Sequence, residues 1–264
     1  MPELPEVESI RRQLVPWLTG LQIISSWSHP SEKFSPALET IGMTIESVNR
    51  RGKYLLLELD DEREMVIHLG MTGQLTRTES LSDPYLRAWW ELDNRSILGF
   101  RDVRRFGRIR VVTGKDYEGT LAHLGPEPLS SDFTPEKFYA DMRKSSRKVK
   151  TQLLSQKPVA GVGNIYADEA CFRAGVYPGL RRVTRKQAER LHLEIKAVLE
   201  LALQNGGTTL RDYVNAEGAQ GRNQEFLLCY GRSDEPCYIC GDILKRTVID
   251  GRGTTYCRGC QKRE

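Results

Sequence analysis

Four cysteines close to the C-terminus form two Cys-x2-Cys pairs, Cys237/Cys240 and Cys257/Cys260, with sixteen residues between the pairs. Four thiolates at this spacing are typical of a tetrahedral zinc site, whereas the alternative, two disulfides, belongs to oxidising compartments. In so small a unit the metal supplies most of the folding energy, an apparent ~10–16 kcal/mol in finger peptides. We therefore predict that residues 226–264 form a zinc finger built on a β-hairpin, with one structural zinc ion.

The composition is that of an ordinary globular protein. With 264 residues, 28% of them charged and 39% hydrophobic, the chain can form more than one domain with its own core. No run approaches roughly 18 consecutive apolar residues, and the acidic N-terminus lacks a signal-peptide segment, so we expect a cytoplasmic protein. A net charge of +4 weakly indicates a polyanionic partner. The other two cysteines, Cys171 and Cys229, lie in apolar surroundings and are expected in the core.

The N-terminal half reads as one helix followed by many short strands. The helix is expected at Pro5–Leu18. The apolar alternation then predicts strands at Ile23–Trp27, Thr44–Val48, Tyr54–Leu59, Glu64–His68, Gly73–Arg77, Trp89–Leu92, Ser96–Phe100 and Arg108–Val112. Many short strands separated by turn residues indicate an antiparallel β-sandwich or flattened barrel. We assign residues 1–130 to this domain.

The pattern becomes helical after a stretch rich in proline and glycine, Leu121–Leu129. Thr134 is a predicted N-cap with Pro135 at the first helical position, and Thr184 caps a later helix that ends before Gly206. Residues 131–225 are therefore predicted to form a helical domain. The expected fold class is α+β and multidomain.

The first residues carry a possible nucleophile. Removal of Met1 would leave Pro2 with a free secondary amine, which is partly unprotonated at neutral pH. Attack of such an amine on a sugar carbon gives a cationic iminium, an effective electron sink. Glu3 and Glu6 lie next to it and could serve as proton donor and orienting carboxylate. The alternative is that Pro5 and these acids simply begin a helix.

Several turns combine cations with apolar side chains. Lys53 follows two arginines at the start of a strand, and Met71 lies at the tip of a glycine-flanked turn. Arg104, Arg105 and Phe106 precede Gly107. Apolar and arginine side chains of this kind can fill the space left by an extruded base. Buried Met and Phe side chains beside solvated arginines are the alternative.

The helical part contains two features suited to phosphate. The run from Arg143 to Lys150 has five cations and no acid, although a solvated helix face would explain it equally well. In Val159–Glu169, two glycines and Asn164 precede a helix and would expose N–H groups at its positive end. Arg252 is predicted near the tip of the zinc hairpin. Lys53, Lys150, Asn164 and Arg252 are candidates for contacts to backbone phosphates, and the alternative for Lys53 and Arg252 is a solvated side chain at a strand end or hairpin tip.

The segment Pro2–Glu8 resembles the N-terminal signature of the formamidopyrimidine-DNA glycosylases, bacterial enzymes that excise oxidised purines. The Lys53 turn, the Leu121–Leu129 segment, the Val159–Glu169 string and the cysteines extend this resemblance over nearly the whole chain. It implies a helix-two-turn-helix module in the helical domain. It also implies that Pro2 is the nucleophile, that Glu3 is the general acid, and that Lys53 contacts DNA and assists elimination. Met71, Arg104 and Phe106 would fill the space that the extruded base leaves in the DNA. Arg105 would contact the DNA backbone, and Arg252 would bind a phosphate beside the lesion.

Two positions depart from the family pattern. Tyr85 occupies a place where a histidine that contacts DNA is usual, and a phenol can still donate one hydrogen bond to phosphate. Asn223 falls where an aromatic residue is common, in a polar segment from Asn215 to Glu225 that we expect to be mobile. In the family this segment closes over the everted base, so the substitution bears on recognition of 8-oxoguanine.

The resemblance implies a bifunctional glycosylase with abasic-site lyase activity that acts as a monomer on duplex DNA containing oxidised or abasic sites. Two alternatives stay open. One is an enzyme like endonuclease VIII, which prefers oxidised pyrimidines. The other is a zinc protein without catalytic activity that binds damaged DNA, for which Pro2, Glu3 and Lys53 would have no purpose.

Overall fold

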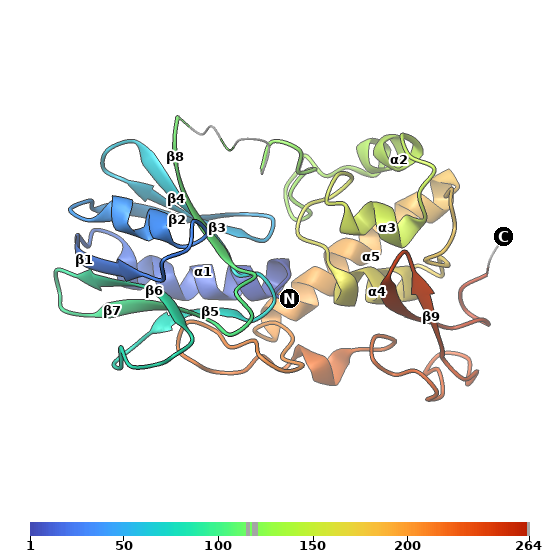
Figure 1. The fold of residues 1–264 in the computed structure, drawn as a ribbon. Helices are drawn as coiled ribbons and strands as arrows, with labels where there is room; N and C mark the ends of the chain where they lie inside the picture. The colour runs from blue at the N-terminus through green and yellow to red at the C-terminus, as the bar shows by residue number, and fades with distance from the viewer. Residues whose placement is uncertain (115–116, 118–120, 263–264) are drawn as a thin grey trace. The chain divides into compact units, whose positions relative to one another are not determined.

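The computed structural model describes residues 1–114, 117 and 121–262. Its elements (Figure 1) are, in chain order, α1 (Leu4–Leu18), β1 (Ile23–Ser28), η1 (Ser35–Thr40), β2 (Ile45–Arg51), β3 (Tyr54–Leu59), β4 (Arg63–His68), β5 (Gly73–Arg77), β6 (Leu86–Leu92), β7 (Ile97–Asp102), β8 (Arg108–Thr113), α2 (Pro135–Arg143), α3 (Val149–Leu154), α4 (Asn164–Arg173), α5 (Arg185–Gln204), η2 (Asn223–Phe226), β9 (Lys245–Ile249) and β10 (Arg252–Tyr256). The predicted α+β architecture is confirmed. All eight strands predicted in the N-terminal half form, with ends shifted by at most three residues.

The strands of the N-terminal half build two antiparallel sheets of four strands each, in the orders β1-β6-β7-β5 and β2-β3-β4-β8. The apolar side chains that face inward from both sheets form one core. Leu55 and Leu57 of β3 belong to it, together with Trp90 of β6 and Phe100 of β7. This is the β-sandwich that the alternation of apolar residues predicts.

Helix α1 packs on this core through one face. Its apolar residues recur at helical spacing, and Val7, Ile10, Leu14 and Leu18 are fully buried. Burial of each such side chain stabilises the fold by roughly 1.5–3 kcal/mol. The helix begins one residue before the predicted Pro5 because Glu3 is the N-cap residue. The acids of the N-terminus are thereby attached to a rigid element.

The helical part follows its predicted capping signals. The Thr134 hydroxyl accepts a hydrogen bond from the Lys137 N–H, and α2 starts at Pro135. Before α5, Thr184 and Gln187 form a reciprocal capping box. Among the described residues, no helix has the length and apolarity that crossing a membrane requires.

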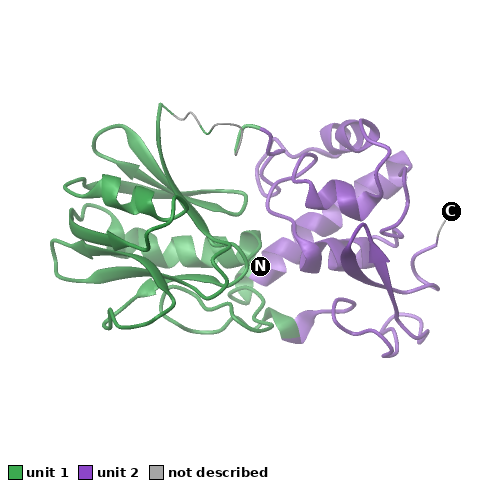
Figure 2. Cartoon of the chain, viewed as in Figure 1, with its two compact units in different colours: residues 1–122, 203–224 green, residues 123–202, 225–264 purple. Residues whose placement is uncertain are grey.

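Two compact units result (Figure 2), residues 1–122 with 203–224 and residues 123–202 with 225–264. These units differ from the predicted domains, which are 1–130, 131–225 and 226–264. The reason is that hydrogen bonds join segments that lie far apart in the sequence. The N–H of Ala216 donates to the side chain of Gln13, which attaches the 203–224 segment to α1. The N–H of Thr255 in β10 donates to Asp168 of α4, which attaches the zinc hairpin to the helices.

Candidate functional site

The acids at the start of α1 form a buried hydrogen-bonded group. Pro2 is buried, whereas Met1 is 49% exposed. The Glu6 carboxylate accepts hydrogen bonds from the Glu3 N–H at 2.7 Å and from the Thr208 N–H at 2.7 Å. Glu3 and Glu6 are almost completely buried. The structure therefore brings Pro2, Glu3 and Glu6 together and fixes the backbone next to the Pro2 nitrogen.

Sequence reasoning missed Glu8, which connects α1 to the turn that carries Lys53. The Glu8 carboxylate binds Arg11 at 2.8 Å and Arg50 at 3.0 Å, and Arg50 also donates to the Gly52 carbonyl. Burial raises the pKa of Glu8, but hydrogen bonds from the two arginines lower it to about 2. Arginines at spacings of three and four residues from an acid, within a helix, are the signal that could have revealed it.

His68 is a second residue that sequence reasoning missed. It lies at the end of β4, where its Nδ1 accepts a hydrogen bond from the Gly70 N–H. Burial, together with the positive charges of Lys53 and Arg108, lowers the pKa of His68 to about 4. The imidazole is therefore neutral at physiological pH. A neutral ring beside Lys53 can donate or accept one hydrogen bond without adding a second positive charge.

The structure brings Met71, Arg104 and Phe106 together at the surface. The Arg104 guanidinium lies 3.5 Å from the Met71 sulfur and 4.7 Å from the centre of the Phe106 ring. Met71 is 39% and Phe106 49% exposed, so the alternative of buried apolar side chains does not hold. The three form one exposed cluster, apolar at two positions and cationic at the third.

Two features fix this cluster. Gly70 adopts φ +65°, and a Cβ there would lie 2.5 Å from backbone atoms of Phe106 and Gly107, so only glycine fits. The fully buried Asp102 carboxylate accepts hydrogen bonds from Thr72 and from the Gly107 N–H. The turn that carries Met71 is thus attached to the segment that carries Arg104 and Phe106.

Arg105, between Arg104 and Phe106, and Tyr85, directly before β6, make contacts separate from this cluster. Arg105 is exposed with φ +56°, and its carbonyl accepts a hydrogen bond from Lys33. Tyr85 is 41% exposed, and the Arg101 guanidinium lies 4.9 Å from its ring centre. Both side chains are therefore accessible to a partner.

The predicted direct phosphate contact of Lys150 does not agree with the structure. Lys150 is fully buried. Its ammonium pairs with Asp168 at 2.7 Å and donates to the Gly253 carbonyl and to the Thr254 hydroxyl. Burial raises the pKa of Asp168 to about 6, although Lys150 lowers it. We correct the assignment: Lys150 attaches the zinc hairpin to α3, because a buried ammonium needs these partners.

Asn164 and Arg252 lie around the same hairpin. The Gly253 carbonyl, next to Arg252, also accepts a hydrogen bond from the Asn164 amide at 3.3 Å. Asp250 and Gly251 have positive φ and form the tight turn before Arg252, whose side chain is exposed. Lys150, Asn164 and Arg252 are therefore neighbours, and of these three only Arg252 is exposed.

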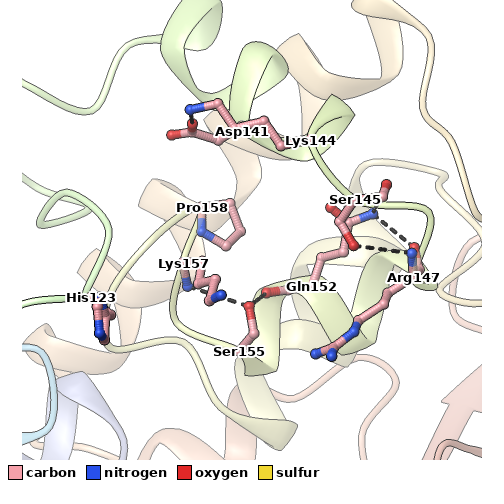
Figure 3. Close-up of a pocket in the computed structure, with 9 residues that line it drawn as sticks. All are labelled: His123, Asp141, Lys144, Ser145, Arg147, Gln152, Ser155, Lys157 and Pro158. Carbon is pink, nitrogen blue, oxygen red and sulfur yellow. Dashed lines mark hydrogen bonds and ion pairs between the residues drawn. The ribbon is translucent and has the colours of Figure 1, made fainter. Parts of the chain in front are cut away.

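Exposed cations of the basic run line a pocket instead. The pocket, of about 500 Å³, lies at the C-terminal end of α2 and beside α3 (Figure 3). Lys144, Arg147 and Lys157 line it together with His123, and Asp141, which also lines it, pairs with Lys144 at 2.5 Å. Two exposed cations of the run, Lys144 and Arg147, therefore lie at this pocket, whereas Lys150 is buried.

The four cysteines converge as predicted. The sulfur atoms of Cys237, Cys240, Cys257 and Cys260 all lie within 4.8 Å of one another, with two pairs at 3.4 and 3.8 Å. A tetrahedron with zinc–sulfur bonds of about 2.3 Å requires sulfur–sulfur distances of about 3.8 Å. The residues therefore fit one structural zinc. Four protein ligands complete its coordination, so the ion would supply fold stability and not a reactive position.

Comparisons with known proteins agree along the chain. Family models described as formamidopyrimidine-DNA glycosylase N-terminal domain, formamidopyrimidine-DNA glycosylase H2TH domain and zinc finger found in FPG and IleRS match residues 1–109, 124–214 and 234–263. The formamidopyrimidine-DNA glycosylase of Bacillus licheniformis is 43% identical over 100% of both chains.

Solved structures give the same result. The crystal structure of the MutM (FPG) protein from Thermus thermophilus is similar with a TM-score of 0.92, at 40% identity over 100% of both chains. A Lactococcus lactis FPG mutant in complex with a DNA containing Fapy-dG has a TM-score of 0.91, at 33% identity over 99% of this chain and 100% of that one.

We predict that His68 titrates near pH 4, well below the ordinary 6.5 of histidine. Between these pH values the unfolded chain binds more protons than the folded one. The free energy of unfolding should therefore fall as pH decreases from 6.5 to 4, by on the order of 3 kcal/mol at most. Ring NMR signals and urea unfolding at several pH values measure this. His68→Asn should remove this part of the pH dependence, and a midpoint above pH 6 would contradict the assignment.

We also predict that Cys257→Ser loses the stoichiometric zinc and the ordered hairpin while the β-sandwich stays folded, because the metal stabilises so small a unit. Zinc content and amide hydrogen exchange in β9 and β10 measure both effects. The matched control is Cys229→Ser, a buried cysteine outside the cluster, which should retain zinc. Full zinc content in Cys257→Ser would show that this thiolate is not a ligand.

Proposed function

Because the chain belongs to the formamidopyrimidine-DNA glycosylase family, we propose that it removes oxidised purines, 8-oxoguanine and formamidopyrimidines, from duplex DNA and then cleaves the abasic site. The observation that carries the proposal is the buried Glu6 carboxylate, which binds the Glu3 N–H and so fixes the backbone beside Pro2. An amine at this position is useful only if Met1 is removed. The protein would work as a cytoplasmic monomer.

The reaction begins at the Pro2 nitrogen. Its lone pair attacks C1′ of the damaged nucleotide, and the glycosidic bond breaks so that the base leaves with its electron pair and takes up the proton that the amine nitrogen loses. Glu3 donates a proton to the sugar ring oxygen as the ring opens. The product is an iminium between Pro2 and C1′. Its positive charge acidifies the C2′ proton.

Strand cleavage follows from that acidity. Loss of the C2′ proton expels the 3′ phosphate by β-elimination, and a second elimination expels the 5′ phosphate. Lys53 assists these steps from the turn that Arg50 and Glu8 fix. His68, whose pKa burial and the charges of Lys53 and Arg108 lower to about 4, adds no positive charge beside Lys53. No electrons are gained or lost overall, so the sequence of steps needs no redox cofactor.

Extrusion of the base is a separate task. Met71, Arg104 and Phe106 form one exposed cluster that would occupy the space the base leaves in the duplex. Extrusion costs a few kcal/mol, and least for a damaged base, so it contributes to selectivity. Arg105, Tyr85 and Arg252 would contact the phosphate backbone through exposed side chains.

The first test is covalent trapping. Borohydride should reduce the iminium and link the protein to DNA that contains an abasic site. Pro2→Gly should lower the yield at least about tenfold, because it replaces the secondary amine. A form that keeps Met1 should not be trapped at all. Pro30→Gly changes an exposed proline of the same unit and should react like the wild type. Equal trapping of the form with Met1 would falsify the role of Pro2.

The second test separates extrusion from bond chemistry. Met71→Ala should slow excision of 8-oxoguanine about tenfold, equivalent to about 1.4 kcal/mol, but hardly slow cleavage of a preformed abasic site, which has no base to extrude. Glu3→Gln should abolish excision and leave some abasic-site cleavage. Single-turnover assays on two duplexes of the same sequence measure both, with the exposed Leu81→Ala as control. Equal slowing of both reactions by Met71→Ala would make Met71 a packing residue.

A further inference from the structure

Asn223 lies inside the protein rather than on its surface. It is 3% exposed in η2, which lies at the end of the segment Asn215–Glu225 that we expected to be mobile. Its Nδ2 donates to the Thr208 hydroxyl at 2.9 Å, and its Oδ1 accepts from the Asn205 amide at 3.3 Å. Its backbone N–H donates to the Gly207 carbonyl at 3.1 Å. Asn223 therefore spans the whole turn that follows α5.

That turn lies directly against Glu6. Gly206 and Gly207 have φ values of +70° and +87°, a conformation that glycine adopts without strain. A Cβ on Gly207 would lie 3.0 Å from Glu6 Oε1 and 3.1 Å from Glu6 Cγ. The backbone at Gly207 therefore approaches the Glu6 side chain so closely that a larger residue would crowd it. This approach places the Thr208 N–H 2.7 Å from Glu6 Oε1.

A continuous series of buried hydrogen bonds results. It runs from the Asn223 side chain to Thr208, from the Thr208 N–H to Glu6, and from Glu6 to the Glu3 N–H. Two adjacent glycines make the turn inherently adaptable, so Thr208 needs a side-chain contact to keep one position. The Tyr213 hydroxyl donates to the Gly206 carbonyl and secures the other end of the turn. Loss of Asn223 would therefore loosen Thr208 without unfolding the turn.

We propose that Asn223 is a positioning residue for the N-terminal site: by fixing Thr208 it orients Glu6, and through Glu6 the backbone that carries Glu3 and the Pro2 amine. The inference rests on the proposed function, in which Pro2 is the nucleophile. A carboxylate in a buried environment acts strongly on a neighbouring amine, and its orientation and donors determine how strongly.

The experiment measures borohydride trapping on a duplex with a preformed abasic site as a function of pH. Such a site has no base, so recognition of the lesion does not enter. Asn223→Ala and Thr208→Val should each lower the trapping rate about tenfold, because small misplacement of reacting groups is costly. Thr208→Ser keeps the hydroxyl and should react nearly like the wild type. The double variant should be no slower than the slower single variant, since both remove one contact.

The pH profile distinguishes positioning from general loss of structure. A Glu6 carboxylate that lacks one donor favours the charged amine more strongly, so the midpoint of the profile should move to higher pH in both single variants. Asn94→Ala, which removes two hydrogen bonds in the exposed β6–β7 turn of the same unit, should change neither rate nor midpoint. Thermal unfolding of each variant gives the folded fraction used to correct the rates.

Three results would overturn the inference: trapping of Asn223→Ala at the wild-type rate, multiplied effects in the double variant, or slower trapping with an unchanged midpoint. Failure of the proposed function looks different, because the wild type itself would then not be trapped. If Asn223→Ala did not fold, Thr208→Val would still test the same contact from its other side.

Discussion

The buried carboxylate of Glu6 is the interaction on which the N-terminal site depends. It accepts one hydrogen bond from the N–H of Glu3, the N-cap residue of α1. It accepts another from the N–H of Thr208, which lies 202 residues after Glu6 in the chain. A buried charge is costly unless hydrogen bonds satisfy it, so both donors must stay in place. The same carboxylate therefore holds the turn after α5 to the start of α1 and fixes the backbone next to Pro2.

Buried acids also organise the helical unit. Glu169 accepts three backbone N–H bonds, from Leu228, Cys229 and Tyr230, and Asp168 accepts one from Thr255 while it pairs with Lys150. These contacts attach two segments to α4: residues 228–230, which precede the zinc-binding cysteines, and β10 of the zinc hairpin. A bound zinc would order the four cysteines, whereas Asp168 holds the hairpin that presents Arg252 and Glu169 holds the chain that leads to it.

Much of the fold was predictable because it follows local rules. The strands have alternating apolar residues, and Thr134 and Thr184 are caps whose hydrogen bonds span three residues. The candidate site was less predictable. Glu8 and Asp102 each bind a partner distant in sequence, as the bond from Arg50 to Glu8 across 42 residues illustrates, and burial with the charges of Lys53 and Arg108 lowers the pKa of His68. The segment around Asn223 reads as polar and mobile, yet Thr208 and Asn205 bury its amide.

The sequence by itself determined the residue types available for chemistry: a proline directly after Met1 with an acid beside it, four cysteines at metal-binding spacing, and cations and apolar side chains in glycine-flanked turns. Only the tertiary structure decided which of these residues meet and which are exposed. It gathered Met71, Arg104 and Phe106 at the surface and buried Lys150 against Asp168. The physical reason is that desolvation and hydrogen-bond partners, which set the role of a charge, depend on segments far apart in the chain.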